Sequence, residues 1–208
     1  MYNIYFLNRV LTICKKDDPV LKDNDVIYLH PSDNYRLTNI PDIMANNPNI
    51  KHLVITEQGS HDTDELFKMM FSKIRHINAA GGFVFNPETD KYLMIRRNDV
   101  WDLPKGWQEE GEELAATAKR EVSEECEIEC NVGDLICMTN HTYLLDGQMV
   151  IKHTYWYAMT PVKDTHIMPQ QEEGITECRW FTENEMKERM EESYGTIREV
   201  LTKAGIIL

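Results

Sequence analysis

The longest regular pattern in the chain is a pair of strand-like runs joined by Asp146 and Gly147. The runs read "GDLICMTNHTYLL" before this dipeptide and "QMVIKHTYWYAMT" after it. An Asp-Gly pair between two such runs is typical of the tight turn in an antiparallel hairpin. We therefore expect a long β-hairpin over residues 133–160, and a mixed sheet with helices packed on it is the most economical architecture around it.

The pattern of the chain changes near residue 76. Upstream, Asp62 precedes an amphipathic run and is expected to cap a helix at its N-terminus. The other elements expected in this part are a strand pair in "NIYFLNRVLTIC", strands in "DVIYLH" and "HLVIT", and helices in "IPDIMANN" and "DTDELFKMMFSKI". Residues 1–76 are thus predicted to form a small α/β domain, and the sequence assigns no activity to it.

Residues 77–208 are predicted to form a second domain. The runs 79–86 and 91–97 flank the turn-forming residues "PETD", which suits another hairpin. A last strand is expected in "TECRWF", followed by Thr182 and Glu185 in a capping-box pattern. Apolar residues at helical spacing then predict one continuous helix containing Met186, Met190, Tyr194, Ile197 and Leu201.

Composition narrows the classes of partner. Lys and Arg number 22 against 35 Asp and Glu, a formal charge of −13, which argues against binding a nucleic-acid polymer. No run approaches the roughly 18 apolar residues of a membrane span, and the N-terminus lacks the pattern of a secretory signal, so a cytoplasmic protein is expected. The five cysteines include no Cys-x-x-Cys pair, and free thiols are expected rather than disulfides or zinc.

The segment "GWQEEGEELAATAKREVSEECEI" places several carboxylates on one side of an expected helix. Glu121, Glu124 and Glu125 are neighbours at the spacing i, i+3 and i+4, and they adjoin an apolar stripe that includes Val122. Like charges near a buried edge repel, and a divalent cation relieves that repulsion. The alternative is an ordinary solvated acidic face paired with Lys119 or Arg120.

The register of this segment resembles the Nudix box, whose pattern is G-x5-E-x7-R-E-U-x-E-E-x-G-U with U apolar. Matching positions are Gly106, Glu112, Arg120, Glu121, Val122, Glu124, Glu125 and Ile128. Glu127 stands where the pattern has its second glycine, a position that follows the helix and favours a left-handed backbone. The resemblance implies a Nudix α/β/α sandwich with a mixed sheet, and hydrolysis of a diphosphate bond in a nucleoside diphosphate linked to another group, with Mg²⁺ or Mn²⁺.

The resemblance also implies residue roles. Glu121, Glu124 and Glu125 are the expected metal ligands, and the backbone carbonyl of Gly106 is a further one. Glu112 and Arg120 are expected to hold the loop and the helix in register through a charge-assisted bond.

The general base is expected to be Glu121 or Glu173, with Glu172 as a substitute for Glu173. Cations expected to face phosphate are Arg96, Lys105 and Lys152, with Arg97 as the alternative to Arg96, because neighbours on a strand point to opposite faces. Flat faces for stacking a base are offered by Trp101, Trp107, Tyr143, Tyr155, Trp156 and Tyr157.

The substrate class stays open at this point. The Nudix box does not distinguish among substrates, because family members that act on dinucleoside polyphosphates, ADP-ribose, nucleotide sugars or damaged nucleoside triphosphates share it. A rival interpretation is a Nudix-fold binding or regulatory module without turnover, and a weaker one is nucleic-acid binding through residues 1–76. For the small domain we expect a role in homodimer formation or in covering the substrate.

Overall fold

The computed structural model describes residues 1–19, 27–29, 36–57, 61–163 and 166–206. Contacts along the chain divide it into two compact units. The first comprises Met1–His76 together with Asn140–Lys152, and the second comprises Ile77–Thr139 and His153–Leu208. The long hairpin is present as β9 (Cys130–Leu145) and β10 (Gln148–Pro161), so its tip belongs to the first unit and its base to the second.

The first unit is a mixed sheet with two helices. Its strands are β1 (Tyr2–Phe6), β2 (Arg9–Cys14), β3 (Ile27–Leu29) and β4 (His52–Thr56), in the order β9-β1-β2-β4-β3. β1 and β2 are antiparallel, whereas β2 with β4, β3 with β4 and β1 with β9 are parallel. The helices are α1 (Ile40–Asn46), which follows a 3₁₀ turn η2 (Leu37–Asn39), and α2 (Thr63–Phe71).

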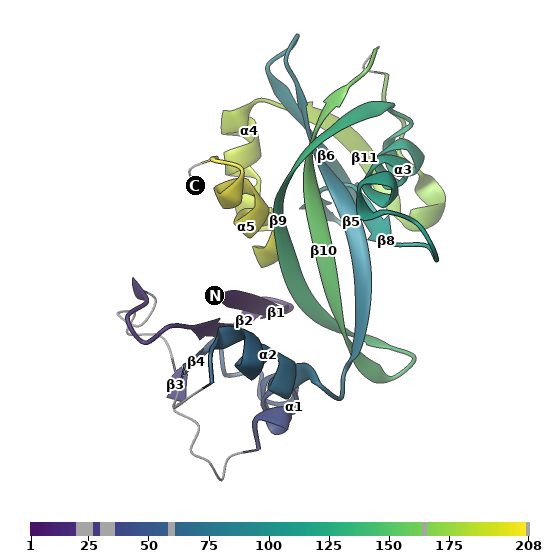
Figure 1. Ribbon diagram of the computed structural model, residues 1–208. Coiled ribbons are helices and arrows are strands. Elements are labelled where there is room, and N and C mark those ends of the chain that lie inside the picture. Colours follow the sequence, from purple (N-terminus) through teal and green to yellow (C-terminus); the bar gives the residue numbers. More distant parts are fainter. Residues whose placement is uncertain (20–26, 30–35, 58–60, 164–165, 207–208) are drawn as a thin grey trace. The chain divides into compact units, whose positions relative to one another are not determined.

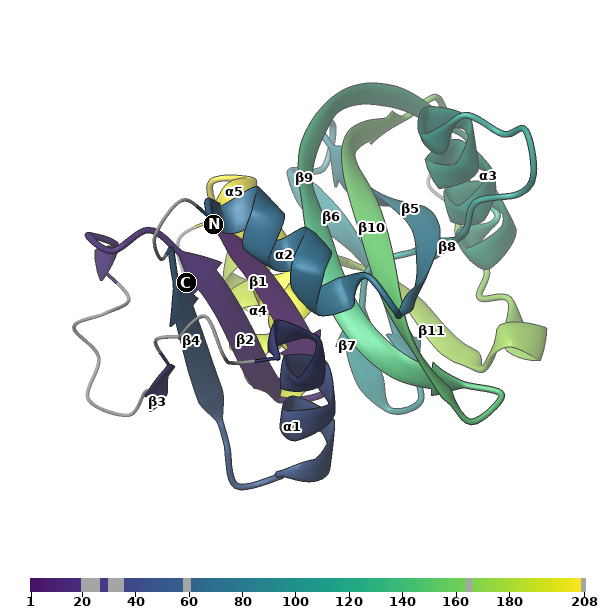
Figure 2. The ribbon, with the colours of Figure 1, turned by 60° about the horizontal axis from the view of Figure 1, so that its bottom comes forward.

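Alternation along the strands explains why α1 and α2 lie over the same sheet (Figure 2). Ile4, Leu11 and Ile13 are fully buried in one cluster with the apolar faces of both helices. Asp62 caps α2 as predicted, since its carboxylate accepts from the backbone N–H of Asp64 and Glu65 at 2.9 Å. The expected strand "DVIYLH" is described only at Ile27–Leu29, and its His30 lies outside the described residues.

The second unit is an α/β/α sandwich (Figure 1). Its sheet has the order β11-β6-β5-β10-β9, with β5 (Arg75–Asn86), β6 (Lys91–Arg97) and β11 (Ile175–Phe181). The short strands β7 (Val100–Asp102) and β8 (Lys105–Trp107) pair with β6 and β5. Helix α3 (Leu114–Cys126) covers one face of the sheet, and α4 (Glu183–Glu188) and α5 (Gly195–Lys203) cover the other.

Strand alternation sorts the apolar side chains between these two faces. Phe83 and Met94 belong to the cluster that contains the residues of α4 and α5. Val84, Leu93 and Ile95 belong to the cluster that contains Ala118 and Val122 of α3. On β6 the odd-numbered residues therefore face α3, and this parity decides which of the two arginines at the end of β6 lies on the α3 side.

The single C-terminal helix predicted from the sequence is wrong. The capping box of Thr182 and Glu185 opens α4 as expected, but α4 ends at Glu188, and a 3₁₀ turn η4 (Met190–Glu192) separates it from α5. Ser193 is extended at the break, where its hydroxyl donates to the carbonyl of Trp101 at 2.8 Å. The apolar spacing survives because Met186, Ile197 and Leu201 still pack into one cluster on both sides of the break.

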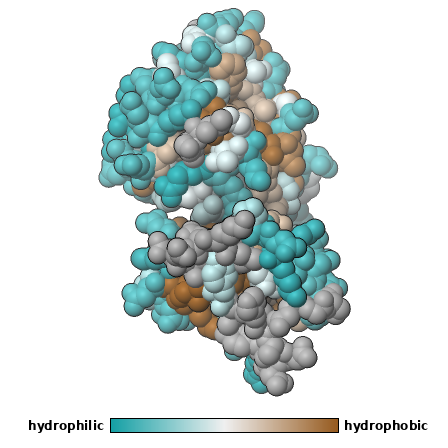
Figure 3. Space-filling model, turned by 90° about the vertical axis from the view of Figure 1, so that its left-hand side faces the viewer, coloured by the Kyte–Doolittle hydropathy of each residue, from teal (hydrophilic) through white to brown (hydrophobic). Residues whose placement is uncertain are grey.

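The face drawn in Figure 3 is mainly hydrophilic, with separate hydrophobic areas. Among the described helices, none combines the length and apolar character needed to cross a membrane. Cys14, Cys126, Cys130, Cys137 and Cys178 are free thiols, of which Cys137 and Cys178 are half-buried and the others buried.

Candidate active site

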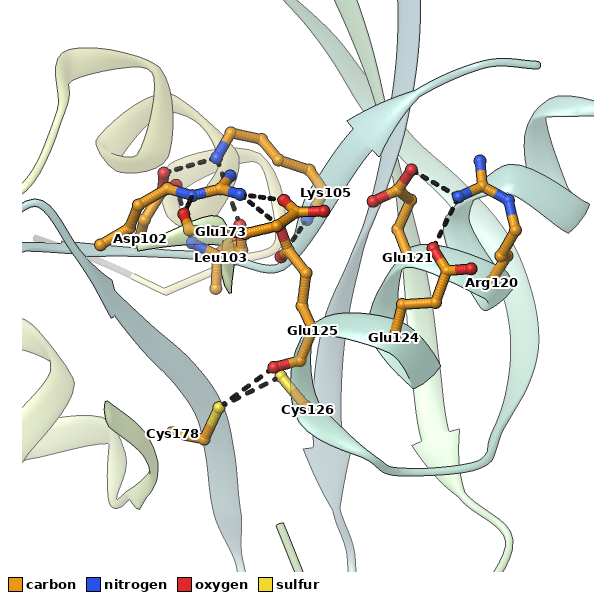
Figure 4. A network of polar contacts seen from close by, with 11 residues as sticks. Asp102, Leu103, Lys105, Arg120, Glu121, Glu124, Glu125, Cys126, Glu173 and Cys178 are labelled. Atoms are coloured by element: carbon orange, nitrogen blue, oxygen red, sulfur yellow. Dashed lines mark hydrogen bonds and ion pairs between the residues drawn. The ribbon is translucent and has the colours of Figure 1, made fainter. Parts of the chain in front are cut away.

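Helix α3 carries the three predicted carboxylates, Glu121, Glu124 and Glu125 (Figure 4). Glu121 is 6% exposed and Glu125 is fully buried, whereas the Glu124 side chain is 49% exposed. The helix ends at Glu127, which has a left-handed backbone with φ 53° and ψ 34°. The sequence pattern therefore located both the helix and its unusual end.

Arg120 contacts the carboxylates of Glu121, Glu124 and Glu112. Its Nη1 lies 2.7 Å from Glu121 Oε1 and 2.8 Å from Glu124 Oε2. Its Nε and Nη2 each donate to Glu112 at 3.0 Å, and Nη2 also donates to the carbonyl of Trp107. The hydrogen bond from Arg120 is the main reason that the pKa of Glu112 is lowered to about 2. The loop after β8 is thus tied to α3 through a charge-assisted bond of the kind expected.

Arg97, at the end of β6, contacts the carboxylates of Glu125 and Glu173. Its Nη2 lies 3.0 Å from Glu125 Oε1 and also forms an ion pair with Glu173. Its Nε donates to the backbone carbonyl of Glu173 at 3.1 Å. Glu173 ends the 3₁₀ turn η3 (Gln171–Glu173), which precedes β11. Residues far apart in the sequence therefore meet beside α3, as Figure 4 shows for Glu125 and Glu173.

Lys105 and Asp102 form a second pair next to Glu125. The backbone N–H of Lys105 donates to Glu125 Oε2 at 3.0 Å, and its ammonium group is paired with the Asp102 carboxylate. Asp102 is 2% exposed, and it also accepts from the backbone N–H of Leu103 at 2.8 Å. Asp102 was not among the site residues predicted from the sequence. A carboxylate between Trp101 and Leu103 in a short strand was the available signal, because a charge among apolar neighbours needs a partner.

Gly106 makes room for Glu121. A Cβ atom at Gly106 would lie 2.1 Å from Glu121 Oε2, well inside contact distance. The Glu121 carboxylate therefore rests against the backbone of β8, which pairs with β5 through Gly106 and Ala80. Any side chain at position 106 would displace this carboxylate.

Burial sets the protonation of the two inner carboxylates. Desolvation raises the pKa of Glu125 to about 7, although Lys105 and Arg97 act in the opposite direction. Desolvation also raises the pKa of Glu121 above its ordinary value, opposed by Arg120. Neither carboxylate is fully balanced by the arginine that it contacts, so both favour additional positive charge.

The carboxylates are oriented toward the arginines. Among the described residues, no group of three or more His, Cys, Asp or Glu side chains is arranged to hold a metal ion as it stands. Glu125 Oε1 is nevertheless buried and accepts no hydrogen bond from a described residue, even though Arg97 lies 3.0 Å away as an ion pair. An unsatisfied anionic oxygen among other carboxylate oxygens fits the donor preference of Mg²⁺ or Mn²⁺.

Strand alternation places the two arginines at the end of β6 on opposite faces of that strand. Arg96 points away from the α3 side, with its Nη2 3.7 Å from Asp99 and its guanidinium 6.0 Å from the ring of Trp101. Lys152 belongs to the first unit, so its role toward substrate stays a prediction. Among the candidate stacking residues, Trp101 and Trp156 are core residues at 5% and 1% exposure, and Trp107 is 47% exposed.

The sandwich fold and helix α3, which carries the glutamate motif, together indicate the family to which the chain belongs. The NUDIX domain family model matches residues 75–201, which is more than half of the chain, and the chain therefore belongs to the NUDIX domain family. The matched region covers most of the second unit, including α3 and the strands on both sides of it.

Two solved structures illustrate the shared fold. A C. elegans Ap4A hydrolase, solved as a binary complex, aligns with a TM-score of 0.50 and 18% identity over 62% of this chain and 95% of its own. A NUDIX hydrolase from Nitrosomonas europaea aligns with a TM-score of 0.50 and 17% identity over 63% of this chain and 89% of its own. At these identities the likeness establishes the fold of the second unit.

Proposed function

We propose that this chain is a metal-dependent hydrolase that cleaves a diphosphate bond in a nucleoside diphosphate linked to another group. The observation that carries the proposal is the convergence of Glu121, Glu124 and Glu125 on the box helix with Glu173 from the loop before β11. Family membership supplies the reaction class.

Mg²⁺, or Mn²⁺ in its place, would be held by Glu121, Glu124 and Glu125, with the Gly106 carbonyl as a further ligand. When bound, the cation lowers the pKa of water and neutralises charge that develops on phosphate. Glu124 is the exposed member of the three, so its side chain has the most freedom to leave Arg120. The carbonyl of Gly106 is suited to bind the same cation as Glu121, because Gly106 adjoins the Glu121 carboxylate.

The protein's own groups would handle the proton. As water attacks phosphorus and a new P–O bond forms, its proton passes to the carboxylate of Glu173 or Glu121. The bond from phosphorus to the bridging oxygen breaks, and its electron pair leaves with the departing phosphate. Glu173 is the better placed of the two for this role, because its side chain is 43% exposed and its carboxylate is within reach of solvent.

The substrate would be a small phosphorylated nucleotide such as a dinucleoside polyphosphate, ADP-ribose or a nucleotide sugar. Lys105 is the phosphate-binding cation that we propose, because its backbone N–H donates to Glu125 and its side chain is 12% exposed. Trp107 is 47% exposed and its backbone carbonyl accepts a hydrogen bond from Arg120, so we propose that its indole ring stacks a base. The first unit would serve dimer formation or cover the substrate.

A second candidate is a NUDIX-fold module that binds a nucleotide without turnover. It is favoured by one observation, namely that Arg120 and Arg97 already pair with the carboxylates that would bind metal. Hydrolysis is favoured over it because a silent module has no need to keep Glu125 buried at a cost of several kcal/mol.

The test is product release from a panel of dinucleoside polyphosphates, ADP-ribose, nucleotide sugars and nucleoside triphosphates, with Mg²⁺ and with Mn²⁺. Glu125→Gln should lose at least about 100-fold in kcat, since the charge that would hold the metal is gone. Glu129→Gln is the matched control, because Glu129 is an exposed glutamate just beyond the helix whose described ion pair is a 3.8 Å contact with Lys119. Tight nucleotide binding without any product would favour the silent module instead.

A further inference from the structure

Arg97 makes its described contacts with groups of the candidate site, whereas its neighbour Arg96 does not reach them. The guanidinium of Arg97 is paired with buried Glu125 and with Glu173, and its side chain is 22% exposed. The two contacts with Glu173 differ in kind, since Nη2 meets the carboxylate and Nε donates to the backbone carbonyl. Because the guanidinium group is planar and rigid, contacts with both the carboxylate and the backbone carbonyl of Glu173 restrict the side chain and the backbone of that residue together.

The segment before β11 is attached to α3 at two further points. The backbone N–H of Gln170 donates to the carbonyl of Glu125 at 3.1 Å, and that of Met168 donates to the carbonyl of Cys126 at 3.0 Å. The acceptors are the last backbone carbonyls of α3, and these hydrogen bonds hold residues 168–170 against the end of that helix. Beyond it, η3 ends at Gly174 with φ 74°.

Within the described residues, Arg97 is the one cation that the Glu173 carboxylate contacts. Because Nη2 of Arg97 also contacts Glu125, the carboxylates of Glu173 and Glu125 lie against the same guanidinium group. Two carboxylates held this close repel each other, and Arg97 is the cation that offsets the repulsion.

We propose that Arg97 is the positioning residue for the carboxylate that accepts the proton of the attacking water. Arg97 binds Glu173 and is also paired with Glu125. It therefore sets the distance between the carboxylate of Glu173 and the glutamates of α3. The proposal rests on the proposed function, and it selects Glu173 over Glu121 as the base. The competing account is that Arg97 binds a substrate phosphate directly.

Arg97→Lys separates these accounts. Lysine keeps a positive charge beside buried Glu125, so the variant is expected to fold, but it lacks the fork that holds Glu173 at two points. We expect kcat to fall about 10- to 100-fold with KM within about twofold, since a misplacement of about 1 Å costs on that order. Arg96→Lys is the matched control and should match the unsubstituted protein in both parameters. A rise in KM with kcat retained would overturn the proposal in favour of phosphate binding.

A double-mutant cycle tests whether Arg97 acts through Glu173. Glu173→Gln should reduce kcat by about 10²- to 10⁴-fold, the range for a general base. The double variant of Arg97→Lys and Glu173→Gln should be no slower than Glu173→Gln alone, because the group being positioned is already lost. Multiplicative effects would show that the two residues act independently, which contradicts the proposal.

Amide hydrogen exchange provides a readout that needs no turnover. In the metal-free protein, Arg97→Lys should speed exchange in residues 171–174 several-fold, whereas Arg96→Lys should not. An unchanged exchange rate in residues 171–174 would refute the proposal that Arg97 positions Glu173, whatever the rate of hydrolysis. Absence of hydrolysis by the unsubstituted protein across the nucleotide panel would instead refute the proposed function, so the two failures are distinguishable.

Discussion

Replacing Glu127 with glycine should stabilise the protein slightly or leave its stability unchanged, with turnover intact. Glu127 has φ 53°, and its backbone N–H donates to the carbonyl of Ser123 at 2.9 Å. The side chain is exposed and makes no hydrogen bond or ion pair with another described residue. The left-handed conformation costs a residue with a Cβ atom about 1 kcal/mol, and glycine adopts it freely.

The expected magnitude follows from two opposing terms. Relief of the left-handed strain contributes about 1 kcal/mol, and the larger conformational entropy of glycine in the unfolded chain removes about 0.4 to 1 kcal/mol of that gain. The net gain is therefore about 0 to 0.6 kcal/mol in the free energy of unfolding, up to roughly 2 °C in Tm for a chain of this length. Glu127→Ala is the control, because it removes the same charge without relieving the strain.

Urea denaturation of the three proteins measures this difference, with nucleotide hydrolysis assayed in parallel. Stability of Glu127→Gly clearly below that of Glu127→Ala would refute the reasoning about the helix end. Loss of turnover in both variants would show that Glu127 belongs to the site and that the set of functional carboxylates is incomplete.

Three further outcomes are expected from the structure. Glu112→Gln should lower the free energy of unfolding by about 1 to 3 kcal/mol at pH 7, the value of a hydrogen-bonded charge. Because the folded pKa of Glu112 is lowered to about 2, this contribution is present above its ordinary pKa and is lost as pH falls from about 4.5 toward 2, so urea titrations of both proteins should converge there. Gly106→Ala should abolish detectable hydrolysis, since its Cβ would lie 2.1 Å from Glu121 Oε2; full activity in a steady-state assay would contradict this. Burial raises the pKa of the Cys130 thiol to about 12, so mass spectrometry should find Cys130 unmodified by iodoacetamide at pH 8 in the folded protein and modified in urea.

Local patterns predicted most elements of the fold because each rests on short-range chemistry. The Asp-Gly turn gave the β9–β10 hairpin, and Asp62 and Thr182 both cap helices as their spacing indicated. The C-terminal helix failed because apolar periodicity reports which residues face the core and not whether the backbone is continuous between them. At the break the hydroxyl of Ser193 donates to the carbonyl of Trp101, a contact between residues far apart in sequence that apolar spacing does not report.

The site was predictable where a motif fixes the register and unpredictable where two elements meet. The box spacing located the glutamates of α3, but the partners of Glu125 come from β6 and from the loop before β11. Strand alternation allowed either Arg96 or Arg97 to face inward. The choice follows from Leu93 and Ile95, which pack against α3 and share the parity of Arg97. That parity is visible in the sequence only when the face covered by α3 is already known.

The charge of the assembled site refines the reason for expecting a cation there. Repulsion between neighbouring glutamates on one helix face is partly relieved by Arg120 and Arg97. These two arginines contact five carboxylates, a formal balance of 2 − 5 = −3 when all are ionised, and Lys105 is matched by Asp102. Burial raises the pKa of Glu125 to about 7 even though Arg97 and Lys105 act in the opposite direction, so the two cations do not offset the cost of desolvating this carboxylate. A divalent cation at the proposed site would change the balance to −1 with both arginines still present, so on the proposed function the arginines would position the carboxylates while the larger share of their charge would be left for the metal.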